Sequence, residues 1–188
     1  MVKKLKKWEL LEEEDISPSP WFPLYKHKIK LPNGNIVDDY YLSKVGDVAM
    51  VVPVTKEGDI VFVKQYKHGA GDVIIELPAG RIKPEYTTEE NAVMELEEET
   101  GYKTDKMILL GTLYGEPSKD TYKVFGFLAG GLTERYEQRL DENEDIDVVH
   151  VPIAKIDDFI KDGNICSPDT IAFIRLAQLK FPEMFKIS

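Results

Sequence analysis

Apolar residues recur at every second position, or in short continuous runs, over much of the chain before residue 130, which predicts a strand-rich region. Segments 21–31 and 37–43 flank an Asn-Gly pair at 33–34, the usual signal of a tight hairpin. Segments 45–55 and 60–65 are mostly apolar around a polar turn, which predicts a buried hairpin. Further strands are expected at 6–11, 73–76, 106–114, 121–128 and 148–152, with Ala129-Gly130-Gly131 ending the fourth of these.

A helical pattern replaces the strand pattern at 87–100. Thr87 and Glu90 have the spacing of a capping box, and Gly101 suits the left-handed residue that often ends a helix. The apolar stripe available for burial is narrow and consists of Ala92, Val93 and Leu96.

Two closing helices follow the last predicted strand. The first is expected at 153–161, with Ile156, Phe159 and Ile160 facing inward. The second is expected at 170–179, because Ser167-Pro168-Asp169 has the form of a helix start. Its predicted apolar stripe is formed by Ile171, Ile174, Leu176 and Leu179.

Three carboxylates lie on one face of the 87–100 helix, because Glu95, Glu98 and Glu99 stand at i, i+3 and i+4. Like charges at this spacing repel, and a divalent cation would reverse that effect. Mg²⁺ prefers such hard oxygen ligands beside substrate phosphates. A solvated acidic face is the alternative and the usual meaning of a run of glutamates. From these residues alone, both interpretations stay open.

The composition is that of a globular protein: 188 residues, 43% apolar and 31% charged. A net charge of −10 argues against a nucleic acid as the main partner, and it means that an anionic substrate needs a metal or a local basic patch. Cys166, expected to be small and partly buried, is the single cysteine, so an internal disulfide is impossible and a reducing cytoplasm fits. No apolar run predicts a signal peptide or a membrane span.

The stretch 77–102 resembles the Nudix motif, G-x5-E-x7-R-E-U-x-E-E-x-G-U, in which U is a bulky apolar residue. The preceding Leu77-Pro78-Ala79 is similar to the ADP-ribose pyrophosphatase branch of that family. We interpret 77–80 as a strand end with a turn and 81–86 as a loop. The matching positions are Gly80, Glu95, Leu96, Glu98, Glu99, Gly101 and Tyr102.

Two positions depart from the motif. Tyr86 stands where the family usually has a glutamate, and Met94 stands where it usually has an arginine. In the family these two residues form an ion pair that braces the loop against the helix. Replacing both partners of a buried pair by apolar groups can be neutral, whereas losing one is costly. We therefore expect a rebuilt brace, with Tyr86 packing against Met94.

An acidic loop at 132–147 carries Asp141-Glu142-Asn143-Glu144, which resembles a stretch before the last strand of ADP-ribose pyrophosphatases. The resemblance implies that Glu142 is the general base and that Glu144 assists the metal. Loops of this length in a compact domain are usually functional or disordered. A solvated acidic loop is the alternative.

The resemblance implies an α/β fold, namely an α/β/α sandwich with a mixed β-sheet and an N-terminal β-arm. The predicted order of strands, one helix, more strands and closing helices agrees with it. We expect the arm at 1–44 and a Nudix hydrolase domain at 45–188. By resemblance the arm is exchanged between the subunits of a homodimer, and a hairpin docked on its own domain is the alternative.

The implied activity is hydrolysis of the diphosphate of a nucleoside diphosphate sugar, with ADP-ribose giving AMP and ribose 5-phosphate. The implied cofactor is Mg²⁺, with Mn²⁺ as a substitute. Lys67 stands where the branch often has an arginine that holds the substrate, and Arg81 is the second candidate for substrate binding. Glu98 is assigned to catalysis as well as to a second ion. The implied metal ligands are the Ala79 carbonyl, Glu95, Glu98, Glu99 and Glu144.

Two alternative functions remain. Lys67, and Ser118 at a place where the branch often has glycine, leave room for a GDP-mannose-type hydrolase. Tyr86 and Met94 favour a catalytically silent module that binds a nucleotide or a protein partner.

Overall fold

A computed structural model describes residues 5–186, which form two compact units. The smaller unit contains the residues up to Gly46 together with Tyr114–Lys123. The larger contains Asp47–Leu113 and the residues from Val124 onward. The sequence-based division at 44/45 assigns 114–123 to the hydrolase domain, whereas in the structure this loop belongs to the same unit as the arm.

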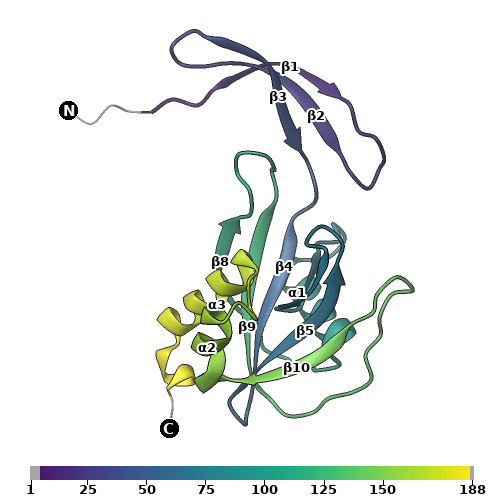
Figure 1. Ribbon diagram of the computed structural model, residues 1–188, viewed down its shortest axis with the longest axis vertical. Helices are drawn as coiled ribbons and strands as arrows, with labels where there is room; N and C mark the ends of the chain where they lie inside the picture. Colours follow the sequence, from purple (N-terminus) through teal and green to yellow (C-terminus); the bar gives the residue numbers. More distant parts are fainter. Residues whose placement is uncertain (1–4, 187–188) are drawn as a thin grey trace, which may run out of the picture. The chain divides into compact units, whose positions relative to one another are not determined.

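The smaller unit is a three-stranded antiparallel sheet in the order β1-β2-β3 (Figure 1). Its strands are β1 (Glu9–Asp15), β2 (Leu24–Lys30) and β3 (Ile36–Ser43). The predicted hairpin is confirmed, with Gly34 at a φ of 92° in its turn. The first strand lies later than the expected 6–11, because its acidic residues face the lysines of β2, as in the Lys28–Glu12 pair at 2.8 Å.

The loop 114–123 is bonded to β3. The backbone N–H of Ser43 donates to the carbonyl of Lys119 at 2.7 Å, and the N–H of Thr121 donates to the carbonyl of Ser43 at 3.2 Å. The hydroxyl of Tyr40 donates to the carbonyl of Ser118 at 2.6 Å. The hairpin tip therefore acts as an extension of the arm sheet.

The larger unit is built on a seven-stranded mixed sheet with the order β10-β5-β4-β9-β8, in which β6 pairs with β5 and β7 pairs with β4. Strands β4 and β9 are parallel, whereas β5 pairs antiparallel with β4, β6 and β10, and β7 pairs antiparallel with β4. The strands are β4 (Val48–Thr55), β5 (Asp59–Lys67), β6 (Asp72–Glu76), β7 (Ala79–Arg81), β8 (Ile108–Tyr114), β9 (Lys123–Leu132) and β10 (Asp147–Pro152).

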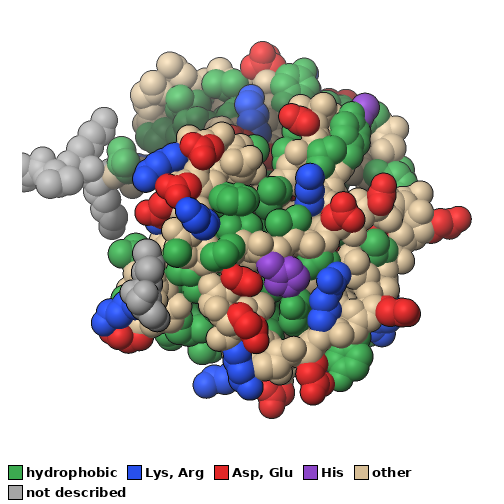
Figure 2. All heavy atoms as spheres, turned by 60° about the horizontal axis from the view of Figure 1, so that its bottom comes forward, with side chains coloured by type: hydrophobic (Ala, Val, Ile, Leu, Met, Phe, Trp, Pro, Cys, Tyr) green, Lys and Arg blue, Asp and Glu red, His purple; other side chains and the backbone are tan. Residues whose placement is uncertain are grey.

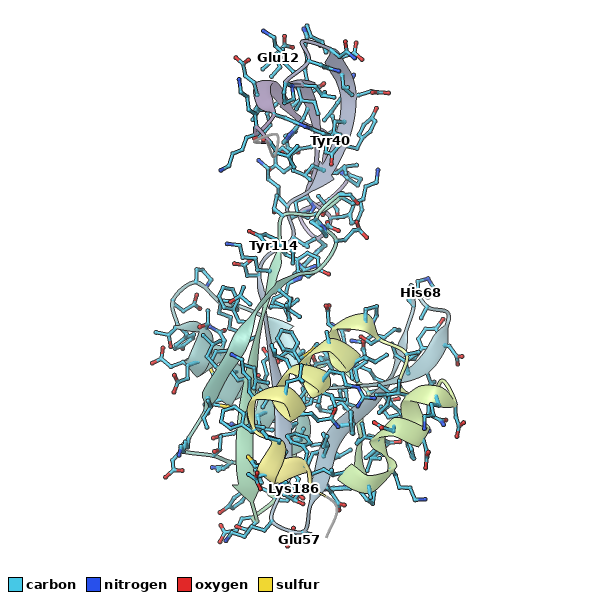
Figure 3. The ribbon with its side chains drawn as sticks, turned by 90° about the vertical axis from the view of Figure 1, so that its left-hand side faces the viewer. Glu12, Tyr40, Glu57, His68, Tyr114 and Lys186 are labelled. Carbon is cyan, nitrogen blue, oxygen red and sulfur yellow. The ribbon has the colours of Figure 1, made fainter. Side chains whose placement is uncertain are left out.

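Helices cover both faces of this sheet, as expected for an α/β/α sandwich (Figures 1 and 3). Helix α1 (Thr88–Thr100) packs on one face, where Ala92 and Leu96 meet Ala49, Val51 and Phe127. Helices α2 (Ile156–Lys161) and α3 (Pro168–Lys180) lie on the other face. Because side chains alternate along a strand, Gly126 faces this second side, where a β-carbon would overlap the ring of Phe173.

The predicted limits of α1 are confirmed. The hydroxyl of Thr87 accepts from the N–H of Glu90 at 3.2 Å, while the Glu90 carboxylate accepts from the N–H of Thr87 at 2.7 Å. The bond from the Thr87 N–H to the Glu90 carboxylate, followed by one from the Thr87 hydroxyl at 2.8 Å, holds the pKa of Glu90 below its ordinary value. Gly101 has a φ of 75° at the other end. A local sequence pattern therefore fixes the helix that carries the three carboxylates.

Three further expectations, about the end of one strand and the burial of two residues, are wrong. Strand β9 continues to Leu132, because Gly130 still pairs with Val54 and the register then shifts at Gly131, where φ is 72°. Leu179 is 79% exposed, since the buried face of α3 is formed by Thr170, Phe173, Ile174 and Ala177. Cys166 is exposed. A short 3-10 turn, Ile153–Lys155, precedes α2, and another, Pro182–Phe185, follows α3.

Charged groups of both signs mingle with hydrophobic side chains on the face drawn in Figure 2. The net charge of −10 is therefore not gathered there into one acidic patch. Among the helices of residues 5–186, none is long and apolar enough to cross a membrane.

Candidate active site

Glu95 and Glu99 project from α1 toward β7. Glu99 is 4% exposed, and its Oε2 accepts a hydrogen bond from the N–H of Ala79 at 2.9 Å. Ala79, whose carbonyl is the predicted metal ligand, thus also orients a predicted carboxylate ligand. The Glu95 carboxylate lies against Gly80, in the space that a β-carbon on Gly80 would fill. The two carboxylates and strand β7 therefore position one another.

The residues around Gly80 form a strand and not the expected turn. Strand β7 pairs antiparallel with β4, with Ala79 opposite Met50 and Arg81 opposite Val48. Arg81, expected in a loop, is therefore the last residue of β7 and is exposed. The loop proper begins after it.

Both carboxylates are hard to ionise. Burial raises the pKa of Glu99 to about 8, with further contributions from the charges of Glu95 and Glu144; the Ala79 N–H and Lys67 act in the opposite direction. The pKa of Glu95 is raised to about 7, chiefly by burial and secondly by the charge of Glu98. Desolvation, followed by repulsion from neighbouring carboxylates, therefore favours the protonated form of both groups.

The donor set suits a hard divalent cation, since its side chains offer carboxylate oxygens that are already shielded from water. Within residues 5–186, however, no three carboxylate, imidazole or thiol groups are already gathered as an ion site. Glu98 and Glu144 are near enough to raise the pKa of Glu95. They are therefore placed to supply further carboxylate oxygens near a cation held by Glu95 and Glu99.

The acidic loop is fastened to the C-terminal end of α1. The carbonyls of residues 98–101, which a helix end leaves without intrahelical partners, accept hydrogen bonds from the loop. The donors are the backbone N–H groups of Tyr136 and Arg139 and the side chains of Arg135 and Gln138, at 2.7–3.0 Å. The loop thus completes the helix that carries the carboxylates.

The tip of this loop is a turn between Asp141 and Glu144. The N–H of Glu144 donates to the carbonyl of Asp141 at 3.0 Å, and the Glu144 carboxylate accepts from the N–H of Asp141 at 2.9 Å. Glu142, the predicted base, lies in this turn and is exposed. The charges of both Asp141 and Glu144 contribute to the raised pKa of Glu95. The structure therefore brings the second acidic cluster toward the first.

Two lysines approach the carboxylates. Lys67 forms an ion pair with Glu76 at 3.5 Å, and its charge also opposes the rise in the pKa of Glu99. The charge of Lys83 likewise opposes the rise in the pKa of Glu95. The sequence did not predict this role, because Lys83 belongs to no recognisable spacing or motif. The positive charges of Lys67 and Lys83 thus partly offset the raised pKa values of Glu99 and Glu95, respectively.

The brace between loop and helix is Asn91, which sequence reasoning missed. Asn91 is fully buried; its Oδ1 accepts from the N–H of Lys83 at 2.8 Å, and its Nδ2 donates to the carbonyl of Thr87 at 2.8 Å. Tyr86 is 46% exposed and, with Met94, lines a surface cavity of about 600 Å³. A buried amide therefore holds the loop, and the packing of Tyr86 against Met94 stays a prediction.

A second cavity, of about 440 Å³, lies beside the acidic loop and contains none of the predicted site residues. Its walls come from β5, β6, the loop and the start of β10. The carboxylates with strongly raised pKa values, Glu95 and Glu99, lie outside this cavity. The lining residues are Lys64, Gln65, Tyr66, Val73, Asn143, Asp145 and Asp147.

Residues 44–170 match the NUDIX domain, which covers more than half of the chain and includes the buried carboxylates. The chain belongs to the Nudix family. Residues 8–43, which form the three-stranded sheet, match the nucleoside diphosphate sugar hydrolase N-terminal domain. The chain is a hydrolase of this family, related to ADP-ribose and GDP-mannose pyrophosphatases.

Several relatives span almost the whole chain. The ADP-ribose pyrophosphatase of Bacillus subtilis (strain 168) is 34% identical over 180 residues, covering 90% of this chain and 95% of that protein. A methanol dehydrogenase activator of Bacillus methanolicus is 29% identical over 92% and 96% of the two chains. A GDP-mannose pyrophosphatase of Yersinia pestis (strain Pestoides F) is 26% identical over 86% and 87%.

A solved structure confirms the fold. The crystal structure of an ADP compounds hydrolase superposes with a TM-score of 0.86, covering 98% of this chain and 100% of the other at 22% identity. The predicted α/β fold with a mixed sheet is therefore correct.

Proposed function

We propose that this Nudix hydrolase cleaves the diphosphate of ADP-ribose to AMP and ribose 5-phosphate, in the presence of Mg²⁺ or Mn²⁺. The observation that carries the proposal is the pair Glu95–Glu99 on α1. Both carboxylates lie against β7, and burial together with neighbouring carboxylates raises their pKa values. The substrate is inferred from the relative of Bacillus subtilis, an ADP-ribose pyrophosphatase.

The proposed roles follow from position. Glu95, Glu99 and the Ala79 carbonyl would hold a divalent cation, which, when bound, neutralises charge on the diphosphate oxygens. Glu98 would serve a second ion and Glu144 would assist. Lys67 meets a phosphate as a point charge on the side of Glu99. Glu142, exposed in the loop turn, takes the proton of the attacking water. Arg81 is exposed and remains available to the substrate.

The loss of the family's usual ion pair does not leave the site unsupported. Asn91 bonds both the N–H and the carbonyl of Lys83, at 2.8 and 3.3 Å, and so fixes the loop that follows β7. A buried amide with satisfied hydrogen bonds replaces a charged pair without an uncompensated charge. Tyr86 and Met94 are therefore compatible with an active enzyme.

A GDP-mannose-type hydrolase is the second candidate. Lys67 lacks the planar guanidinium that ADP-ribose pyrophosphatases often place here, and Ser118 stands in the loop where that branch often has glycine. GDP-mannose pyrophosphatases of three Yersinia strains are 26% identical over 179 residues. The two candidates share the carboxylate chemistry and differ in the base and sugar.

A substrate panel tests the proposal. ADP-ribose, GDP-mannose, ADP-glucose and dinucleoside polyphosphates are each incubated with the protein in Mg²⁺ and in Mn²⁺, and nucleoside monophosphates are quantified. The proposal expects the highest kcat/KM for ADP-ribose, with AMP as product. A higher kcat/KM for GDP-mannose would select the second candidate. The same panel with Glu99→Gln shows whether the turnover comes from this site.

A further inference from the structure

Gln138 is bonded at both hydrogens of its side-chain amide. Its Nε2 donates to the carbonyl of Glu99 at 2.7 Å and to the carbonyl of Ile146 at 3.0 Å. The first acceptor belongs to a buried carboxylate residue of α1, and the second precedes β10. Gln138 itself is partly buried, and Ile146 is 5% exposed. One side chain therefore joins the helix, the loop and the last strand.

These bonds close the segment 139–145, which carries the predicted base. Its first residue is held to α1 by the bond from the N–H of Arg139 to the carbonyl of Glu98, at 2.9 Å. Its far end is held at Ile146 by Gln138. Between these anchors lies the Asp141–Glu144 turn, in which Glu142 is exposed. The placement of that turn relative to α1 thus depends on Gln138.

We propose that Gln138 is a positioning residue, which latches the segment 139–145 to α1 and so sets the distance from Glu142 to the Glu95–Glu99 pair. The inference rests on the proposed function, in which Glu142 is the base. Misplacing a reacting group by about 1 Å costs on the order of 100-fold in rate. A side chain that never touches the substrate can therefore control kcat.

A substitution at Gln138 can remove its two hydrogen bonds without changing the size of the side chain. Gln138→Glu keeps the size of the side chain but places acceptor oxygens opposite two carbonyls, so both hydrogen bonds are lost. Arg139→Ala is the matched control at the next position. It removes only the exposed ion pair with Glu97 at 3.3 Å and leaves the backbone bond to Glu98 intact.

The latch predicts a specific kinetic pattern. Gln138→Glu lowers kcat about 10- to 100-fold, while KM and the activating Mg²⁺ concentration stay within about threefold of wild type. For Arg139→Ala, kcat, KM and the activating Mg²⁺ concentration all stay within about threefold of wild type. Hydrogen exchange of the amides in 139–146 rises in Gln138→Glu and is unchanged in Arg139→Ala.

A double-mutant cycle with Glu142→Gln decides whether Gln138 acts through the base. In the Glu142→Gln background, adding Gln138→Glu should change kcat by less than about threefold, because the group to be positioned is already gone. An equal loss of kcat in both backgrounds would show a merely structural role and overturn the latch. Wild-type kcat in Gln138→Glu would overturn it as well.

The failure of the latch differs from the failure of the proposed function. If wild type turns over and Glu142→Gln is impaired while Gln138→Glu is normal, only the latch is wrong. If Glu142→Gln keeps full activity, the base assignment falls and the latch falls with it. If wild type releases no nucleoside monophosphate from any nucleotide sugar, the proposed function itself is wrong.

Discussion

The carboxylate of Glu95 lies against the α-carbon of Gly80, in space that any larger residue would occupy. Gly80 is not among the glycines with positive φ, so its backbone conformation is open to other residues. The glycine is therefore needed for the close approach of a carboxylate, and this approach ties β7 to α1.

Gly80→Ala should displace Glu95 and lower kcat/KM by about 10- to 100-fold, because the added β-carbon overlaps the carboxylate. Steady-state kinetics measures the effect, and circular dichroism checks that the fold persists. Gly69→Ala is the matched control, since a β-carbon there meets nothing within 4 Å. Unchanged kinetics in Gly80→Ala would show that Glu95 has no role at its observed position.

Asn91→Ala should lower the free energy of unfolding by about 1–3 kcal/mol, because the backbone groups of Lys83 and Thr87 lose their buried partners. Urea unfolding measures the change. Tyr86→Ala, at an exposed position, should cost only about 0.5 kcal/mol. If Tyr86→Ala lowered the free energy of unfolding more than Asn91→Ala does, Tyr86 and not Asn91 would be the residue that braces the loop.

Without metal, the protein should lose stability as pH rises from about 4.5 to 8. The folded-state pKa of Glu99, about 8, lies above its ordinary value of 4.5, so the native state binds more protons in this window. The free energy of unfolding then falls with pH, by up to about 1.4 kcal/mol per pH unit for one proton. Urea unfolding in EDTA measures the slope, and Glu99→Gln should flatten it. The account would be contradicted if the free energy of unfolding of wild type, measured relative to that of Glu99→Gln, increased as pH rises.

Mg²⁺ binding should release protons near neutral pH. Carboxylates whose pKa values are about 7 and 8 are partly protonated there and must ionise to bind a cation. Titration calorimetry in buffers of different ionisation enthalpy counts the protons released. Glu95→Gln and Glu99→Gln should each reduce the count. Tight Mg²⁺ binding without proton release would place the ion elsewhere.

The protein should be a homodimer. The arm exposes large apolar side chains, including Trp8 at 52% and Trp21 at 81%, which favour burial against a partner. Sedimentation equilibrium of the full chain should give twice the mass of 21.4 kDa. Removing residues 1–44 should shift the mass toward the monomer. A full chain that stays monomeric at micromolar concentration would favour a hairpin docked on its own domain.

The parts predicted from sequence are those with local causes. The limits of α1 follow from Thr87, Glu90 and Gly101, and the shared face of its glutamates follows from helical spacing. The missed parts depend on contacts between distant segments. In the sequence Asn91 is an ordinary polar residue of a helix, and only the folded chain shows its bonds to the backbone of Lys83. Gln138 belongs to no recognisable motif. Gly130 and Gly131 look like a strand end, yet they form an irregularity within β9.

The most direct test of the central claim is the rate of AMP formation from ADP-ribose as Mg²⁺ is titrated, for wild type and Glu99→Gln. The account predicts a saturable dependence on Mg²⁺ in wild type and a loss of at least about 100-fold in Glu99→Gln. An equal rate in both proteins, or the absence of AMP at saturating Mg²⁺, would contradict it.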